Sequence, residues 1–564
     1  MRRSIRDKLP YVLLILTKMA LVWPLPMTAL PTYGYDEELF VSLADHLAQG
    51  KWLGPYGPIT LAKGPGYPMF IAAGFRMGIT LAHTHQALYI AFCVAFVVAW
   101  APVIKNPWGR LLLFTVLLFN PISCQISTFA NANREGVYPA MTGLVFAGAI
   151  GMIVRYRRPV WKIVLWALGL GFALGYFWIT REEGVWVVPS LVLIVSSGAV
   201  ALVRERAADW IKRLSVMVLI PTGVCILMVC AVCEINRRAY GEFIEVEFKD
   251  SAYLAAYGAL ARIEPAKFQR FVPVTKETRL RAYAVSPTFA KLKPFLEGDL
   301  GRRWEGSTTD FYRDIHGEMA GGWFMWALRE SITAAGYGNG AKVGHDFFAQ
   351  MAKEINAACD DGRLRAGPRR DTMMPAWRWD YLKPTISAAE DGVVILVRLP
   401  GLRAHIAPSL GTVAERTEYS LMIGQPITAG RDGSFGQSLH PPPPDVVERL
   451  NGIARILWFY RHVVPTWTIL ALAIFIAASV AMLKKYRSWL WVAGTALLGA
   501  MILRIILLAY IDTASFGAIN LLYLSCCVQL LLAFNVLMTI EAAGFLRRRW
   551  TTRRYPSKTA STAA

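Results

Sequence analysis

Cysteine is nearly absent from the one long polar stretch of the chain, residues 236–452. Of eight cysteines, only Cys359 lies there, so this stretch cannot be held together by a disulfide bond of its own. Internal repeats are also missing, as are low-complexity tracts apart from the HPPPP run and the small, polar C-terminal tail. The first apolar run carries Lys18 and two prolines without a small-x-small cleavage site. We therefore expect a retained membrane helix and not a cleaved signal peptide.

Acidic residues are scarce as well. The chain has 39 Asp and Glu against 60 Lys and Arg, a formal net charge of +21. In a soluble chain this balance would suggest a nucleic-acid partner, but here the basic residues cluster in short connections between apolar blocks, where they orient helices in a bilayer. The composition is 55% hydrophobic with a mean hydropathy of +0.38, and the apolar blocks are about 20 residues long. We predict a polytopic α-helical membrane protein that binds no nucleic acid.

Ten apolar segments are long enough to cross a bilayer as helices. They are residues 11–30, 86–104, 109–125, 136–154, 161–180, 185–203, 214–235, 463–483, 488–510 and 519–545. An eleventh segment, residues 66–81, is short, is interrupted by Pro68 and Gly74, and carries Arg76. Hydropathy alone does not decide whether this segment crosses.

The basic clusters decide the topology. If residues 66–81 do not cross and the N-terminus is cytoplasmic, every basic cluster lies on the cytoplasmic side, whereas one more crossing would move the clusters down to Lys212 outside. The clustered residues are Lys105, Arg110, Arg155, Arg157, Arg158, Lys162, Arg204, Arg206, Lys212, Arg213, Lys484, Lys485, Arg487, Arg547, Arg548, Arg549, Arg553 and Arg554. We therefore predict a juxtamembrane helix at 66–81 on the outer face, about ten transmembrane helices, and both termini in the cytoplasm.

These spans divide the chain into four parts. We predict an N-terminal membrane module (1–235) with a first outer loop (31–85), an extracytoplasmic, periplasmic soluble domain (236–452), C-terminal membrane helices (453–546) and a basic cytoplasmic tail (547–564). The inserted soluble domain is predicted to be mixed α/β, with helices near 251–262 and 341–358, extended stretches at 242–248 and 392–400, and a proline-rich exit.

The first outer loop carries the first candidate residues. Asp36 and Glu37 begin a segment whose apolar residues between 39 and 47 share one helical face, so we predict an amphipathic helix that lies on the membrane surface and begins at Asp36. Lys63 follows in the turn KGPGYP. Taken alone, Asp36 is typical of a helix N-cap, Glu37 of a residue that complements the helix dipole, and Lys63 of a snorkelling lysine.

Further charged residues lie on the same predicted side of the membrane. They are Arg134 and Glu135 in the second outer loop, Arg181, Glu182 and Glu183 in the third, and Arg504 near the outer end of the ninth span. Charges that converge at one membrane depth are costly, and they indicate a shared polar cavity. The alternative is that the loop residues form local ion pairs and that Arg504 snorkels.

The order of these features resembles the GT-C superfamily of polyprenyl-phosphate-dependent glycosyltransferases, and most closely the aminoarabinose transferases of lipid A and the protein O-mannosyltransferases. These families also have an acidic pair after the first span, an amphipathic helix, and a Lys-Pro-Pro turn that opens a juxtamembrane helix. Here the turn reads Lys63-Gly64-Pro65. The resemblance covers about residues 11–200 and is thin beyond. Gly64 departs from the family pattern, and so does the large insert between the seventh and eighth spans, which leaves the acceptor open.

The resemblance implies an inverting hexosyl- or pentosyltransferase on the extracytoplasmic face of a bacterial-type inner membrane. Asp36, with Glu37 beside it, would be the catalytic base that deprotonates a cell-envelope acceptor. Lys63, Arg181 and Arg504 would bind the phosphate of a polyprenyl-phosphate-linked sugar donor. The residues expected to orient the acceptor or a metal ion are Arg134, Glu135, Glu182 and Glu183.

A metal cofactor stays open. Some members of the family that the chain resembles bind a divalent ion at an acidic position of the second outer loop, which corresponds here to Glu135. Without an Asp-x-Asp motif at this place, a Mg²⁺ or Mn²⁺ ion has no assigned ligands. His83 and His85 lack a nearby third ligand, so we interpret them as polar residues of the membrane interface.

Two other functions stay open. A transporter or flippase for a lipid-linked sugar would also place charges among its spans, although the repeat symmetry and midplane charges typical of transporters are not evident. A non-catalytic factor for envelope-polysaccharide assembly would need Asp36 only as a helix cap.

Overall fold

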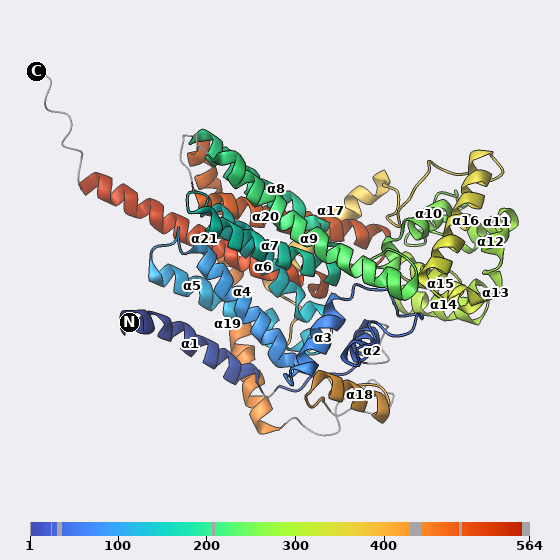
Figure 1. Ribbon diagram of the computed structural model, residues 1–564, viewed down its shortest axis with the longest axis horizontal. Coiled ribbons are helices and arrows are strands. Elements are labelled where there is room, and N and C mark those ends of the chain that lie inside the picture. Colours follow the sequence, from blue (N-terminus) through green and yellow to red (C-terminus); the bar gives the residue numbers. More distant parts are fainter. Residues whose placement is uncertain are drawn as a thin grey trace, which may run out of the picture.

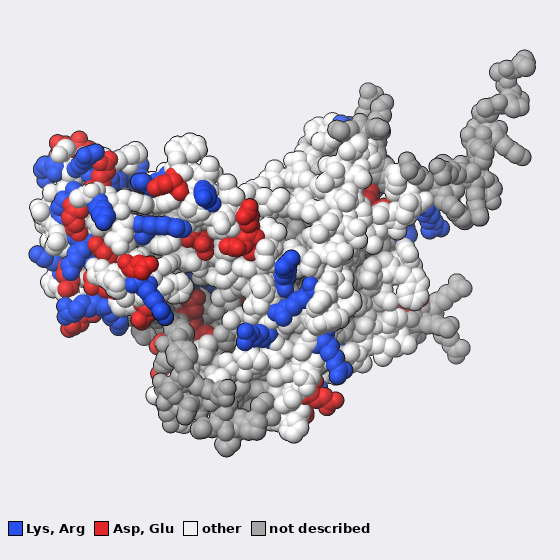
Figure 2. Space-filling model, turned by 180° about the vertical axis from the view of Figure 1, so that it is seen from behind, with Lys and Arg blue, Asp and Glu red and all other residues white. Residues whose placement is uncertain are grey.

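A computed structural model of the 564-residue chain describes residues 2–23, 25–30, 36–205, 209–428, 443–483 and 488–554, without side chains for 2–6, 483 and 548–554. Arg206, Lys484, Lys485, Arg487, most of the HPPPP run and the end of the basic tail lie outside the described residues. The described part is a long helical bundle with a group of shorter helices at one end (Figure 1). Charged side chains gather on that end, and the face of the bundle in Figure 2 is mostly uncharged.

Eight of the described helices are long and apolar enough to cross a membrane. They are α4 (Leu81–Trp100), α6 (Tyr138–Ile153) together with the turn before it (span Arg134–Ile153), α7 (Val160–Thr180), α8 (Val188–Arg204) together with the turn before it (span Gly184–Arg204), α9 (Trp210–Tyr240), α19 (Pro444–Leu483), α20 (Trp489–Ala514) and α21 (Leu521–Arg554). The chain is thus a multi-pass membrane protein, as the sequence predicts.

The predicted number of ten crossings is not confirmed, because two predicted spans do not form long apolar helices. The first begins in α1 (Arg2–Val22), whose opening turns are strongly basic and which also carries Lys18. The third is α5 (Pro107–Leu118), which has only 12 residues. It ends early because Asn120 and Pro121 start a separate 3₁₀ turn, and 12 residues span about 18 Å of a core about 30 Å thick.

Two short helices lie against the bundle end that carries the candidate residues (Figure 1). Helix α2 (Asp36–Ala48) is an amphipathic helix over the predicted segment, and it buries Leu39, Phe40 and Leu43. Helix α3 (Gly66–Arg76) has 11 residues, which is too short to cross a bilayer. The two helices pack against each other, so the doubtful segment 66–81 is part of a platform at the end of the bundle.

The residues between α9 and α19, which we call the insert, are mainly helical where the structure describes them. They form α10 (Ser251–Ala261), α11 (Lys276–Val285), α12 (Pro287–Ala290), α13 (Lys293–Leu296), α14 (Asp299–Phe311), α15 (Gly321–Ile332), α16 (Ala341–Asp360), α17 (Leu382–Arg398) and α18 (Val413–Ile423). The two helices predicted near 251–262 and 341–358 are confirmed as α10 and α16. The short turns of the chain are η1 (Pro121–Cys124), η2 (Ser127–Phe129), η3 (Arg134–Gly136), η4 (Gly184–Val187), η5 (Glu247–Lys249), η6 (Thr333–Tyr337) and η7 (Trp379–Tyr381).

The predicted mixed α/β character of the insert is not confirmed. Its described residues contain no sheet, and only two isolated β-bridges occur, Met27 with Ile427 and Ile263 with Ala366. The prediction of an extended stretch at 392–400 is wrong, because most of it belongs to α17. Residues four apart along this helix, such as Gly392 and Leu396, are buried on one face, where α17 packs against α19, α20 and α21.

The insert shares a hydrophobic core with the first loop. Leu39 and Phe40 of α2 belong to the same buried cluster as Phe324 of α15, Phe348 of α16 and Tyr419 of α18. Burial of this much aromatic and aliphatic surface holds the insert firmly against α2 of the first loop. The α2–α3 platform is therefore held between the bundle and the insert.

Candidate active site

Asp36 and Lys63 form an ion pair where the first loop meets the bundle. The Lys63 Nζ lies 3.6 Å from the Asp36 Oδ1, and the two side chains are 16% and 39% exposed. Asp36 is the first residue of α2, so its carboxylate lies at the positive end of the helix dipole. The Lys63 ammonium also lies 5.5 Å from the ring centre of Trp326. The structure thus brings the two residues of the predicted centre together at a partly open position.

Glu182 connects this pair to the second and third loops. Its Oε2 lies 2.7 Å from the Arg134 Nη1, and its Oε1 accepts a hydrogen bond from the Gly64 N–H at 3.1 Å. Burial alone would raise the pKa of Glu182, but the charges of Arg134 and Lys63 outweigh it and lower this pKa to about 2. Glu182 is therefore an anion that holds the Lys63 backbone next to Arg134.

A second, more deeply buried cluster adjoins the first. Arg181 is fully buried and pairs with Glu135 and with Glu183, whose Oε2 is 2.8 Å from the Arg181 Nε. Arg504, also fully buried, places its Nη1 3.9 Å from the same Glu183 oxygen. Burial opposes ionisation of Glu183, but Arg181 and Arg504 keep its pKa well below the usual range. Residues from α20 and from two separate loops thus meet in one charged cluster.

The arginines of these clusters keep hydrogen-bonding capacity that no described residue uses. Within the described part of the chain, the buried Arg134 Nε, Arg181 Nη2 and Arg504 Nη1 have no hydrogen-bond acceptor. Buried donors are almost always paired in folded proteins. Three unused donors on guanidinium groups suit an anion with several oxygens, above all a phosphate, which arginine binds well.

Glycine at position 64 has a structural reason. A Cβ atom there would collide with the carbonyl oxygen of Ile179, at the end of α7. Gly66 lies against Thr180 in the same way, and its carbonyl oxygen accepts a hydrogen bond from the Tyr176 hydroxyl at 2.5 Å. The turn after Lys63 therefore lies directly on α7, and only glycine leaves room for this close contact at position 64.

Glu37 lies apart from the Asp36–Lys63 pair. Its buried Oε2 accepts hydrogen bonds from the Tyr419 hydroxyl at 3.1 Å and from the Leu30 N–H at 3.2 Å. Burial raises the pKa of Glu37 to about 7. The carboxyl group therefore links α2 to the chain before it and to α18 by buried hydrogen bonds, and is placed to support the fold.

Glu37 makes stability pH-dependent. Because its folded-state pKa is raised from 4.5 to about 7, its carboxyl group favours folding most below the unfolded pKa, and this advantage is lost as pH rises through about 7, by up to about 3 kcal/mol. We expect Glu37→Gln to reduce the fall in melting temperature between pH 5 and pH 8, measured by thermal unfolding in detergent. Asp45→Asn, on the same helix, should keep the wild-type slope. An unchanged slope in Glu37→Gln would contradict this assignment.

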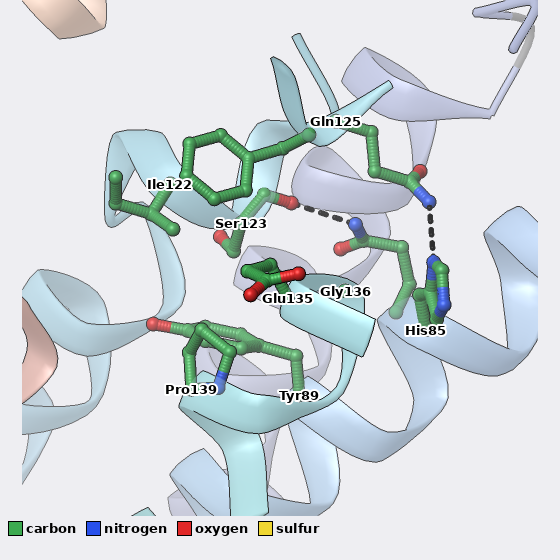
Figure 3. A pocket seen from close by; sticks show the side chains of 10 residues that line it. His85, Tyr89, Ile122, Ser123, Gln125, Glu135, Gly136 and Pro139 are labelled. Atoms are coloured by element: carbon green, nitrogen blue, oxygen red, sulfur yellow. Dashed lines mark hydrogen bonds between the residues drawn. The ribbon is translucent and has the colours of Figure 1, made fainter. Parts of the chain in front are cut away.

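Glu135 is one of the residues that line a small polar cavity (Figure 3). It has a volume of about 20 Å³ and is lined by His85, Gln86, Gln125 and Glu135 among others, and Figure 3 shows the Glu135 carboxylate in its middle. This volume admits a single water molecule. Such a water could satisfy the Glu135 Oε2 and the Gln86 Oε1, two buried acceptors without a partner among the described residues.

The described residues contain no group of three His, Cys, Asp or Glu side chains arranged to hold a metal ion. His85 lies between the Tyr67 hydroxyl at 3.2 Å and the Gln125 amide at 3.4 Å. His83 lies beside Thr80, and its ring contacts that of Trp23 at a tilt of 58°. A metal ligand set is therefore not assigned to Glu135 or to either histidine.

Aromatic residues complete the charged clusters, and the sequence did not indicate them. The Arg181 guanidinium lies 5.0 Å from the ring centre of Tyr138 and 5.2 Å from that of Tyr523, distances at which cation–π attraction contributes. Trp326 lies beside Lys63, although the two residues are far apart in sequence. Tyr138 is near Arg134 in sequence and could have been proposed from that proximity, whereas no local signal marks Trp326 or Tyr523.

Comparison with known proteins gives one structural likeness. No family model and no curated protein matches the chain. Two crystal structures of ArnT from Cupriavidus metallidurans are similar to it. The apo structure has 15% identity and a TM-score of 0.30 over 93% of this chain and 77% of ArnT. The structure bound to undecaprenyl phosphate has 13% identity and a TM-score of 0.32 over 98% and 81%.

Proposed function

We propose that the chain is an inverting glycosyltransferase that moves a sugar from a polyprenyl-phosphate carrier to an acceptor in the cell envelope. The observation that supports this proposal is the combination of a carboxylate and several cationic groups at one site. A partly exposed carboxylate, Asp36, is paired with Lys63 next to three guanidinium groups that have unused donors, those of Arg134, Arg181 and Arg504. A base beside an anion site is the arrangement that transfer from a phosphate leaving group requires.

Asp36 would act as the general base. It accepts the proton of an acceptor hydroxyl as the acceptor oxygen attacks the anomeric carbon of the donor sugar. The bond between that carbon and the phosphate oxygen breaks, and its electrons stay on the polyprenyl phosphate. Because the acceptor enters opposite the leaving group, the anomeric centre is inverted. The products are the glycosylated acceptor and polyprenyl phosphate, and Asp36 then releases its proton to water.

Lys63, Arg181 and Arg504 would bind the donor phosphate and stabilise the charge that develops on it. Lys63 forms an ion pair with Asp36. A phosphate that takes over the Lys63 ammonium would release Asp36 from this pair, so that the base becomes available once the donor is bound. Glu135, Glu182 and Glu183 hold the arginines in place, and an acceptor would enter at the exposed side of Asp36. We place the site on the extracytoplasmic face of the inner membrane.

The donor-binding role of Lys63 can be tested by direct binding. We expect Lys63→Gln to weaken the affinity for undecaprenyl phosphate by about 10-fold, because it removes one charge-assisted contact worth about 1.5 kcal/mol. Titration of the purified protein in detergent measures this. Lys51→Gln, which removes an exposed lysine of the same loop, should bind like the wild type.

The same preparations test the proposed function as a whole. Wild-type protein should release polyprenyl phosphate from a polyprenyl-phosphate-linked sugar and glycosylate an envelope extract. Equal affinity of Lys63→Gln and wild type for undecaprenyl phosphate would remove Lys63 from the donor site. Absence of any sugar transfer by the wild type would overturn the enzymatic function.

A further inference from the structure

The backbone just before Lys63 has an unfavourable conformation. We call residues 57–63 the Lys63 turn. Within it, Leu61 is fully buried and has φ of 56°, a left-handed conformation in which the Cβ of a leucine crowds the backbone. Such residues persist only where the surrounding structure holds them, and they are concentrated at functional sites. Something outside the turn must therefore fix it.

Two residues of the insert hold the Lys63 turn by its backbone. The buried Arg329 side chain donates hydrogen bonds to the carbonyl oxygens of Pro58 and Thr60. The Glu247 N–H donates to the carbonyl oxygen of Leu61 at 2.9 Å. These partners are nearly 200 residues or more away in sequence, so the insert adds to the local hydrogen bonds of the turn, such as that from the Thr60 N–H to the Gly57 carbonyl oxygen.

Arg329 is itself held in place by an ion pair. Its Nε lies against the Glu247 carboxylate, and the other oxygen of this carboxylate accepts a hydrogen bond from the Tyr56 hydroxyl. Both charged side chains are largely shielded from solvent. The planar guanidinium can satisfy a carboxylate and two carbonyl oxygens at once, which a lysine ammonium cannot do with the same geometry.

The same helix also contacts the Lys63 side chain. Trp326 precedes Arg329 by three residues on α15, so the two side chains lie on one face of the helix. The Lys63 Nζ lies 5.5 Å from the Trp326 ring centre, and a tryptophan face attracts an ammonium at this distance. One face of α15 therefore fixes the backbone before Lys63 and contacts its charged end.

We propose that Arg329 is a positioning residue for Lys63 and that the insert completes the donor-phosphate site. This inference rests on the proposed function, since it assigns to Lys63 the binding of the lipid phosphate. Arg329 holds the left-handed turn, Glu247 orients Arg329, and Trp326 supports the ammonium. The insert is then part of the catalytic unit, whatever acceptor it also contacts.

The test compares Arg329→Gln and Arg329→Lys with the wild type and with Arg302→Gln, which removes an exposed arginine of the insert. We expect both Arg329 variants to bind undecaprenyl phosphate at least 5-fold more weakly and to exchange the backbone amides of the Lys63 turn at least 10-fold faster, by mass spectrometry. Arg329→Lys keeps a charge opposite Glu247 and should remain folded. Arg302→Gln should match the wild type in both measurements.

A double-mutant comparison separates positioning from general loosening. If Arg329 acts through Lys63, then Arg329→Lys added to Lys63→Gln should weaken binding by less than 2-fold, because the interaction it supports is already lost. Multiplicative losses would overturn the inference, as would wild-type affinity and exchange in Arg329→Lys. Neither measurement needs sugar transfer, so both test Arg329 even if the wild type proves inactive as a transferase.

Discussion

Asp36→Asn is expected to lower the turnover of sugar transfer by about 100- to 10,000-fold, the usual contribution of a positioned general base. Asparagine has nearly the shape of aspartate but cannot accept the acceptor proton at neutral pH. The Asp36 side chain is 39% exposed and its ion pair with Lys63 is 3.6 Å long, so the fold should not depend on it. Turnover with a polyprenyl-phosphate-linked sugar and melting temperature in detergent together measure this.

Donor binding distinguishes this outcome from a general loss of the site. If Lys63 binds the donor phosphate as proposed, Asp36 competes with this phosphate for the ammonium, and Asp36→Asn should bind undecaprenyl phosphate as tightly as the wild type or more tightly. Asp45→Asn, on the same helix, should keep wild-type turnover. Full activity in a folded Asp36→Asn protein would show that Asp36 is only the first residue of α2, as the simple helix-cap interpretation holds.

The charged centre could be predicted because buried charged residues are rare in and beside membrane-spanning segments. Arg134, Arg181 and Arg504 are far apart in sequence, but buried charges are so costly near a bilayer that they must pair or bind a ligand. Their predicted common side of the membrane therefore implied a common cavity. The structure joins all three to glutamates in two adjoining clusters.

Glu37 shows where sequence reasoning reached its limit. It carries the same charge as Asp36 and follows it directly, yet successive residues of a helix point about 100° apart. One carboxylate therefore meets Lys63, and the other is buried against Tyr419. Which of the two faces the site depends on how α2 is rotated, and α18, nearly 400 residues away, fixes this rotation.

The insert was the least predictable part. Trp326 and Arg329 lie on an amphipathic helix like many others, and their partners in the first loop are more than 250 residues away. No periodicity links such positions. The apolar run in α17 was misread as extended because a short apolar run suits a buried strand as well as a buried helix.

Arg181→Leu is expected to have the largest effect on stability of any single change at the site. Arg181 is fully buried and pairs with both Glu135 and Glu183, so its removal leaves the buried Glu135 carboxylate without its cation and Glu183 with only its 3.9 Å contact to Arg504, at a cost of about 3–5 kcal/mol. Transfer should fall below detection, because the donor phosphate loses a guanidinium and the negative charges of Glu135 and Glu183, no longer balanced by Arg181, repel it. Thermal unfolding and turnover in detergent measure the two effects.

The charge on Glu135 offers a way to separate these two effects. Arg181→Leu combined with Glu135→Gln removes one unpaired carboxylate, so it should regain part of the lost stability and none of the lost transfer. Arg157→Gln, which breaks an exposed ion pair at another place, should cost less than about 1 kcal/mol. Wild-type stability of Arg181→Leu alone would contradict the conclusion that Arg181 and its glutamate partners are charged in the folded protein. If the double variant regained transfer along with stability, Arg181 would serve the fold and not the donor phosphate.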